Sequence, residues 1–217
     1  MAAWVGQDTS TGAIYIEGKG VTTPRLVDAV RELYPVHSVP RADVCEDYSQ
    51  PGAFHALRAV ITASKGVKVK SYFERLPDDP TDGSTWAVGQ RGGVAYLRLY
   101  EKGKQPEFRD QGRPDWVRAE LECRPHYAKD KRAVASMQPA QVWGMSSWSH
   151  SVGQSLMQAE IARYEAPIRQ YSYDKTTRYI ATTFRRHLEE MLVNGEDIQR
   201  TFQAIWEDAD ASQAHRH

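Results

Sequence analysis

Residues 82–105, DGSTWAVGQRGGVAYLRLYEKGKQ, predict two β-strands joined by a tight turn. Short apolar runs flank the Gly-Gly pair, as in a hairpin with a glycine-containing loop. In the second run, YLRLYEK, two leucines alternate with Tyr96, Arg98, Tyr100 and Lys102. Every second side chain of a strand points to the same face, so this strand is expected to have one apolar and one polar face.

Two other runs repeat this two-faced pattern, at residues 41–47 (RADVCED) and 117–123 (VRAELEC). Their polar faces are expected to hold Arg41, Asp43, Cys45 and Asp47 in the first run and Arg118, Glu120 and Glu122 in the second. Carboxylates gathered on one sheet face are suitable ligands for a hard divalent cation such as Mg²⁺ or Mn²⁺. The alternative is a solvated face with cross-strand ion pairs of little energetic worth.

The order of predicted elements indicates an α+β fold: an antiparallel or mixed β-sheet with helices packed on one face and a helical C-terminal part. Strands are expected within residues 12–20, 39–49, 67–76, 84–90, 94–103 and 115–125. Helices are expected at 23–35, 51–64, 159–167, 176–195 and 196–208. Residues 1–130 then form the catalytic sheet, and residues 131–217 form a helical part packed on the same domain.

Composition limits the classes of function. The 217 residues carry 28 Lys and Arg against 28 Asp and Glu, which argues against a protein that binds polyanions with its whole surface but permits a local basic groove. No apolar run approaches the ~20 residues of a membrane span, so no membrane partner is expected. The two cysteines, Cys45 and Cys123, have no metal-ligand spacing and are expected to be buried free thiols of a cytoplasmic protein.

The runs RADVCED, TWAVGQRGGVAYLRLYEKG and WVRAELE, in this order and spacing, resemble the replication initiation factor family. The family pattern is R-x-D-x-x-x-D, T-x-Y-x-G-x-R, R-x-Y-[DE]-K-G and R-x-E-x-[EK]. The resemblance spans residues 18–206, and the runs VWGMSSW and RRHLEEMLVNG are closest to the phage branch. It implies a rolling-circle initiator that nicks a duplex origin through a tyrosine, leaving a tyrosine–5′-phosphate link and a 3′-hydroxyl. The implied partners are origin DNA with a single-stranded or cruciform nick site and a helicase of the bacterial host.

The resemblance also implies roles for individual residues. The metal ligands for Mg²⁺ or Mn²⁺ would be Asp43 and Glu120, joined by Glu122 or Asp47. The DNA contacts would be Arg91, Arg98, Lys104 and Arg118. Lys102 would either contact phosphate or donate a proton.

Ala87 departs from the family pattern, because it stands where the nucleophilic tyrosine is expected. Three explanations are open: a Tyr→Ala replacement that stops cleavage, a shifted register in which Tyr96 or Tyr100 is the nucleophile, or a protein that only binds DNA. The last would make the chain a non-catalytic single-strand or origin DNA-binding module. Family members also carry a strand-rich segment before the stretch that begins at residue 12, so a short member or a truncated chain is expected.

Overall fold

The structure is a computed structural model, and it describes residues 3–79, 81–165, 185, 189, 190, 193, 194 and 200. The chain divides into two compact units, Met1–Ala166 and Pro167–His217. The predicted helices 176–195 and 196–208 lie almost entirely outside the described residues.

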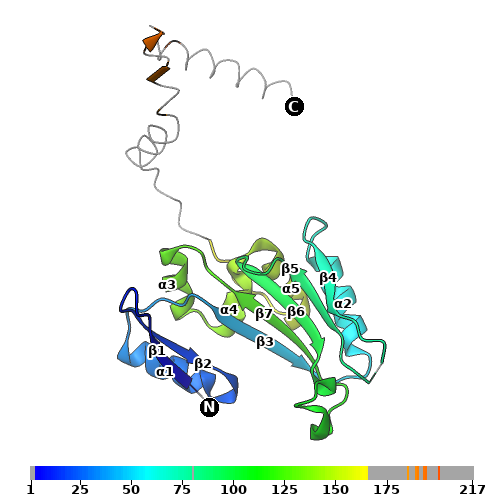
Figure 1. Cartoon of the computed structure of the whole chain (residues 1–217). Helices are drawn as coiled ribbons and strands as arrows, with labels where there is room; N and C mark the ends of the chain where they lie inside the picture. Colours follow the sequence, from blue (N-terminus) through cyan, green and yellow to red (C-terminus); the bar gives the residue numbers. More distant parts are fainter. Residues whose placement is uncertain are drawn as a thin grey trace. The chain divides into compact units, whose positions relative to one another are not determined.

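A five-stranded antiparallel sheet is the centre of the first unit (Figure 1). Its strands follow the order β3-β7-β6-β5-β4. Their bounds are Ala42–Tyr48 for β3, Ser71–Arg75 for β4, Thr85–Gly89 for β5, Ala95–Glu101 for β6 and Val117–Cys123 for β7. Every pair of neighbours is antiparallel, which confirms the predicted α+β class and narrows the antiparallel or mixed sheet to an antiparallel one.

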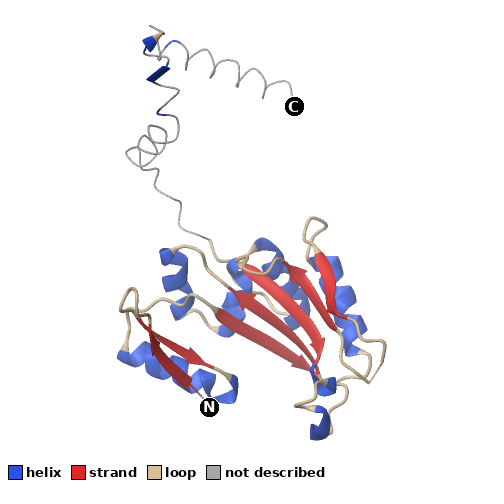
Figure 2. Ribbon diagram, viewed as in Figure 1, coloured by secondary structure: helices blue, strands red, loops and turns tan. Residues whose placement is uncertain are grey.

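Helices cover one face of this sheet (Figure 2). The helices are α2 (Ala53–Ser64), α3 (Ala128–Ser136), α4 (Pro139–Val142) and α5 (Ser147–Met157). The apolar strand residues Leu97, Leu99 and Leu121 are fully buried against the side chains of α2 and α5. Burial of such side chains stabilises the fold by about 1.5–3 kcal/mol each, so this face holds the core. The helices therefore lie on the Leu97/Leu99 side, as predicted.

A hairpin and a helix precede the sheet within the first unit. β1 (Ala3–Gln7) pairs with β2 (Ile14–Gly18) as an antiparallel hairpin, and α1 (Thr23–Leu33) follows it. Arg31 of α1 donates hydrogen bonds to the carbonyl oxygens of Ala135 and Met137 at 2.8 and 2.7 Å, which ties this part to α3. The sequence did not predict β1, α3 or α5.

Two expectations were wrong. Residues 159–165 are not helical, although their apolar spacing predicted the start of a helix. Cys45 is exposed, because the alternation of β3 turns it to the polar face, whereas Cys123 is buried in the core as expected. Among the described residues no helix is long and apolar enough to cross a membrane.

Candidate nucleic-acid interface

The sheet face away from the helices carries the polar residues that the strand alternation predicted, and we call it the polar face. Directly paired residues of neighbouring antiparallel strands point to the same side, so the register gives rows across the sheet. The central row contains Cys45, Glu120, Arg98, Ala87 and Tyr72. The row on one side contains Asp43, Glu122, Tyr96 and Gly89, and the row on the other side contains Asp47, Arg118, Tyr100 and Thr85.

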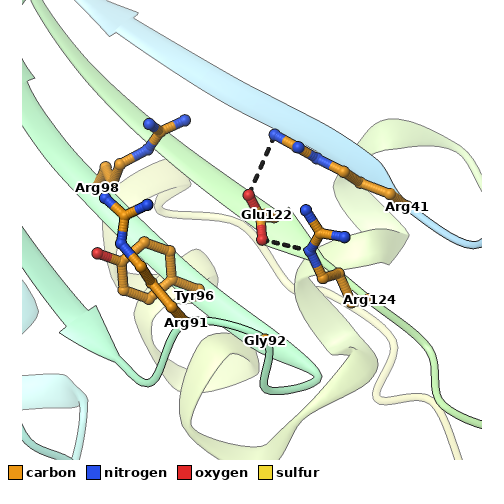
Figure 3. A pocket seen from close by; sticks show the side chains of 7 residues that line it. All are labelled: Arg41, Arg91, Gly92, Tyr96, Arg98, Glu122 and Arg124. Atoms are coloured by element: carbon orange, nitrogen blue, oxygen red, sulfur yellow. Dashed lines mark hydrogen bonds and ion pairs between the residues drawn. The ribbon is translucent and has the colours of Figure 1, made fainter. Parts of the chain in front are cut away.

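Four arginines from different parts of the chain meet on the polar face around one hollow, which we call the arginine pocket (Figure 3). Its lining residues are Arg41, Arg91, Gly92, Tyr96, Arg98, Glu122 and Arg124, and its volume is about 480 Å³. Arg41 precedes β3, Arg91 belongs to the β5–β6 turn, and Arg124 follows β7. Guanidinium groups bind phosphate through paired N–H donors, so such a pocket suits a phosphate-bearing ligand.

Each arginine of the pocket already has a carboxylate partner. Glu122 accepts from Arg124 at 2.6 Å and pairs with Arg41 at 3.1 Å, as the dashed lines of Figure 3 show. Arg98 pairs with Glu120, directly opposite on β7. The remaining pairs are Arg41–Asp43 and Arg91–Glu74. The pocket is therefore rich in N–H donors but close to neutral in charge.

Hydrogen bonds favour the ionised form of two of these carboxylates, Glu122 and Glu74. Burial alone would raise the pKa of Glu122, but the hydrogen bond from Arg124 and the nearby charge of Arg41 outweigh it and hold that pKa below the usual value. The pKa of Glu74 is lowered in the same way, with burial opposed by hydrogen bonds from Tyr96 and Arg91. Both carboxylates thus act as acceptors rather than donors.

Two tyrosines form a bridge across β5. The hydroxyl of Tyr72 on β4 lies 3.2 Å from the hydroxyl of Tyr96 on β6. Neighbouring strands are ~4.8 Å apart, so the two rings reach over the strand between them. On that strand the residues paired with the two tyrosines are Ala87 and Gly89, which have small side chains or none. Ala87 is fully buried although it belongs to the polar face.

The remaining tyrosine of the polar face, Tyr100, is tied to the central row. Its hydroxyl donates to Glu120 at 2.9 Å, and Glu120 also accepts from Arg98. Burial raises the pKa of Tyr100, and the adjacent charge of Glu120 and the hydrogen bond to it add to the rise. This phenol consequently stays protonated at neutral pH.

A second cluster lies at the other end of the polar face, around Trp116. Arg118 binds Asp47 through two hydrogen bonds of 2.7 Å, and the indole of Trp116 donates to the same carboxylate at 2.9 Å. The ammonium of Lys102 lies 4.6 Å from the Trp116 ring and 4.5 Å from that of Phe108, within cation–π range. Burial lowers the pKa of Lys102, and the charge of Arg118 lowers it further.

The structure thus brings together some of the predicted site residues and separates others. Arg91, Arg98 and Glu122 line the arginine pocket, with Asp43 and Glu120 bound to arginines of the pocket. Lys102 and Arg118 belong to the Trp116 cluster. Lys104 lies in the turn after β6 and pairs with Glu101 at 2.8 Å.

Sequence reasoning missed three residues near the pocket: Arg124, Tyr72 and Glu74. Arg124 continues the alternation of Arg118, Glu120 and Glu122, so the period-2 signal could have identified it. The other two lie on β4, and both contact the hydroxyl of Tyr96 on the polar face. No signal in the run SYFER says which side faces the core.

A divalent ion needs several oxygen ligands close together, and the expected ligands here are Asp43, Glu120 and Glu122. Among the residues that the structure describes, no three His, Cys, Asp or Glu side chains are grouped so that they could hold an ion. Asp43, Glu120 and Glu122 instead accept hydrogen bonds from arginines. As the chain is folded here, these carboxylates fit arginine partners and not a shared metal.

No protein-family model and no curated protein matches the sequence. Among solved structures, a rolling circle replication initiator protein from Geobacillus stearothermophilus is similar with a TM-score of 0.42 and 16% identity. The match covers 76% of this chain, which spans 64% of that protein's length. A likeness this distant assigns neither a family nor an activity to the chain.

Proposed function

We propose that this chain is a replication initiator of the rolling-circle type, which binds single-stranded or locally opened origin DNA on its polar face and nicks one strand through a tyrosine. The observation that carries the proposal is the arginine pocket, where four guanidinium groups surround a hollow next to tyrosine hydroxyls. The order of sequence motifs supports the same class of protein.

The arginines can bind a phosphodiester although each has a carboxylate partner. A guanidinium has five N–H donors, and a carboxylate uses one or two of them. Glu120 accepts from the Nη2 of Arg98, so this pair uses only one of the two amino groups of the guanidinium. Binding would then rest on the geometry of N–H donors around phosphate oxygens more than on net charge.

Use of a divalent cation, Mg²⁺ or Mn²⁺, is a separate question that experiments can test. An ion could reach Asp43, Glu120 or Glu122 only if it replaced an arginine as their partner. Isothermal titration with Mn²⁺ should therefore detect no strong site on the free chain, whereas a site formed with bound DNA should vanish in the Asp43→Ala, Glu120→Ala double variant.

DNA binding can be tested by fluorescence anisotropy with a fluorescein-labelled single-stranded oligonucleotide. Affinity should fall with salt, with a log–log slope of about −0.7 for each phosphate contacted. Replacement of Arg98 by Met should weaken binding and reduce the slope by about one such contact. Arg75→Met is the matched control, because Arg75 forms an exposed ion pair with Asp82 away from the pocket. Equal affinity of the two variants would contradict the assignment of the pocket.

Cleavage can be tested with a random-sequence pool of single strands, because the origin sequence is unknown. The unaltered chain with Mg²⁺ or Mn²⁺ should form a protein–DNA species that survives SDS. Binding without this adduct would favour the second candidate function, a DNA-binding module that does not cut. The burial of Ala87 at the expected nucleophile position is the observation in favour of that candidate. Absence of binding would refute both.

A further inference from the structure

Tyr72 is the most accessible tyrosine of the polar face. The residue is 43% exposed, whereas Tyr96 and Tyr100 are 2% and 8% exposed. It is paired with Ala87, so it emerges next to the position where the sequence motifs place a nucleophile. Because its hydroxyl touches that of Tyr96, which lines the arginine pocket, the phenol of Tyr72 lies at the edge of this pocket.

The hydrogen bonds around Tyr96 fix the direction of the Tyr72 hydroxyl. Tyr96 donates its single hydroxyl proton to Glu74, a carboxylate that can only accept while it is ionised. The oxygen of Tyr96 is then left as an acceptor, so the proton shared by the two phenols is the one from Tyr72. Arg91 also donates to Glu74, at 3.0 Å, and its guanidinium lies 5.5 Å from the Tyr96 ring.

This arrangement separates the roles of the two phenols. Burial raises the pKa of Tyr96, and its hydrogen bonds to Glu74 and Tyr72 add to the rise, so Tyr96 keeps a proton. The hydroxyl proton of Tyr72 points toward Tyr96, and its lone pairs are directed away from the bridge. A phenol on a partly exposed residue, with its hydroxyl held in one orientation, suits nucleophilic attack on a phosphodiester.

We propose that Tyr72 is the nucleophile, oriented by Tyr96 and Glu74, that attacks a DNA phosphodiester bound in the arginine pocket. This inference rests on the proposed function and names the residue that performs it. Tyr96 and Glu74 act through the Tyr72 hydroxyl: Tyr96 accepts its proton, and Glu74 accepts the proton of Tyr96.

The reaction is a transesterification that needs no oxidant or reductant. The Oη of Tyr72 forms a bond to phosphorus while the bond from phosphorus to the 3′-oxygen of the preceding nucleotide breaks. The Tyr72 proton passes to the Tyr96 oxygen as the Tyr96 proton passes to Glu74, and Glu74 then returns a proton to solvent. The leaving 3′-oxygen takes a proton from water and becomes a 3′-hydroxyl. The products are a tyrosine–5′-phosphate diester and a free 3′-end.

The groups that face this bridge determine its pH dependence. They are Glu74 from β4, Arg91 from the β5–β6 turn, Arg98 from β6, and Glu122 from β7, which is directly opposite Tyr96. Replacement of Tyr96 by Phe removes the acceptor for the Tyr72 proton. The rate of adduct formation should then fall at neutral pH and recover as the pH is raised, because hydroxide can take the Tyr72 proton in place of Tyr96.

Two probes separate this inference from the proposed function. The first is the activated diester bis(4-nitrophenyl) phosphate, which tests the nucleophile without any DNA sequence. The chain should release one equivalent of 4-nitrophenolate and acquire a stable aryl phosphodiester that peptide mass spectrometry locates at Tyr72. The Tyr72→Phe variant should lose this label, whereas Tyr100→Phe, the matched control on the same face, should keep it. Labelling at another residue, or none, would overturn the inference whether or not the chain binds DNA.

The second probe is the random single-stranded pool. Tyr72→Phe should lose adduct formation, because phenylalanine has no oxygen to attack phosphorus, and should keep the DNA affinity of the unaltered chain. Far-ultraviolet circular dichroism and thermal unfolding check that the variant folds. If Tyr72→Phe still forms the adduct, cleavage stands and Tyr72 is excluded. In the Tyr96→Phe variant, loss of activity without recovery at high pH would mean that Tyr96 supports only the structure.

Discussion

The Arg98–Glu120 pair at the centre of the polar face allows a quantitative test of how these charges contribute to stability. Arg98 lies directly opposite Glu120 on the neighbouring strand, and their side chains are 31% and 15% exposed. Replacement of Arg98 by Met removes a charge-assisted hydrogen bond worth about 1.5–3 kcal/mol. It also removes the buried Nε that has no hydrogen-bond partner among the described residues, and this increases stability by about 1 kcal/mol. Glu120 keeps the hydrogen bond from Tyr100 at 2.9 Å.

The net destabilisation expected for Arg98→Met is therefore about 0.5–2 kcal/mol, from the difference of these two terms. For a chain of this size it corresponds to a fall in the melting temperature of about 1–8 °C. The exposed Arg75–Asp82 pair, with side chains 50% and 39% exposed, is the control, and Arg75→Met should cost about 0–0.5 kcal/mol.

Urea denaturation followed by circular dichroism measures both variants. A double-mutant cycle that adds Glu120→Gln isolates the coupling between the two side chains, which should be about 1–2 kcal/mol. A coupling energy no larger than the error of such cycles, about 0.3 kcal/mol, would refute the reasoning. So would an Arg98→Met variant as stable as Arg75→Met.

Three further predictions concern pH, thiol reactivity and packing. The pKa values of Glu74 and Glu122 are lowered in the fold, so the stability they contribute is complete above the unfolded pKa of about 4.3 and is lost as the pH falls through the lower folded pKa values. The melting temperature should therefore drop below about pH 4.3 and should drop less in the Glu74→Gln variant. The same dependence of melting temperature on pH in both proteins would contradict this. Cys45 should react with a maleimide in the folded chain and Cys123 only after unfolding, since one is exposed and the other buried; mass spectrometry of the labelled peptides decides, and equal labelling rates would be the contrary result. Ala87→Tyr should lower stability by about 1–3 kcal/mol because a ring must fit at a fully buried position, and a variant as stable as the parent would show that the space is already there.

The sequence predicted the strands of the sheet and the faces of three of them, because the period-2 pattern is strong in those runs. Leu97 and Leu99 alternate with Arg98 and Tyr100, and the structure places the two pairs on opposite faces. The alternation of side chains depends only on the geometry of a single strand, so it can be predicted without knowing which strands lie beside it.

Helix α5 could not be found in this way. Its sequence, SWSHSVGQSLM, places Ser149 on the buried side, where the hydroxyl donates to the carbonyl of Trp143 at 2.8 Å. Ser146 caps the helix by accepting from the backbone N–H of Ser149. A polar residue on the core-facing side interrupts the apolar period of 3.6, and its partner lies in another segment of the chain. Only the tertiary fold identifies the interaction that satisfies it.

The site itself depends on strand order and register, which no single run of sequence contains. Tyr72 and Ala87 are separated by fifteen positions, yet they are directly paired, and Tyr96 reaches over the same strand to the Tyr72 hydroxyl. A small residue at position 87 allows two rings from the flanking strands, β4 and β6, to meet above β5. In the sequence motif, Ala87 stands where a tyrosine is expected. In the strand register, the Tyr72–Tyr96 contact covers Ala87, and Tyr72 of β4 supplies a phenol next to this position. A tyrosine placed at position 87 would therefore compete with the Tyr72–Tyr96 contact for the same space.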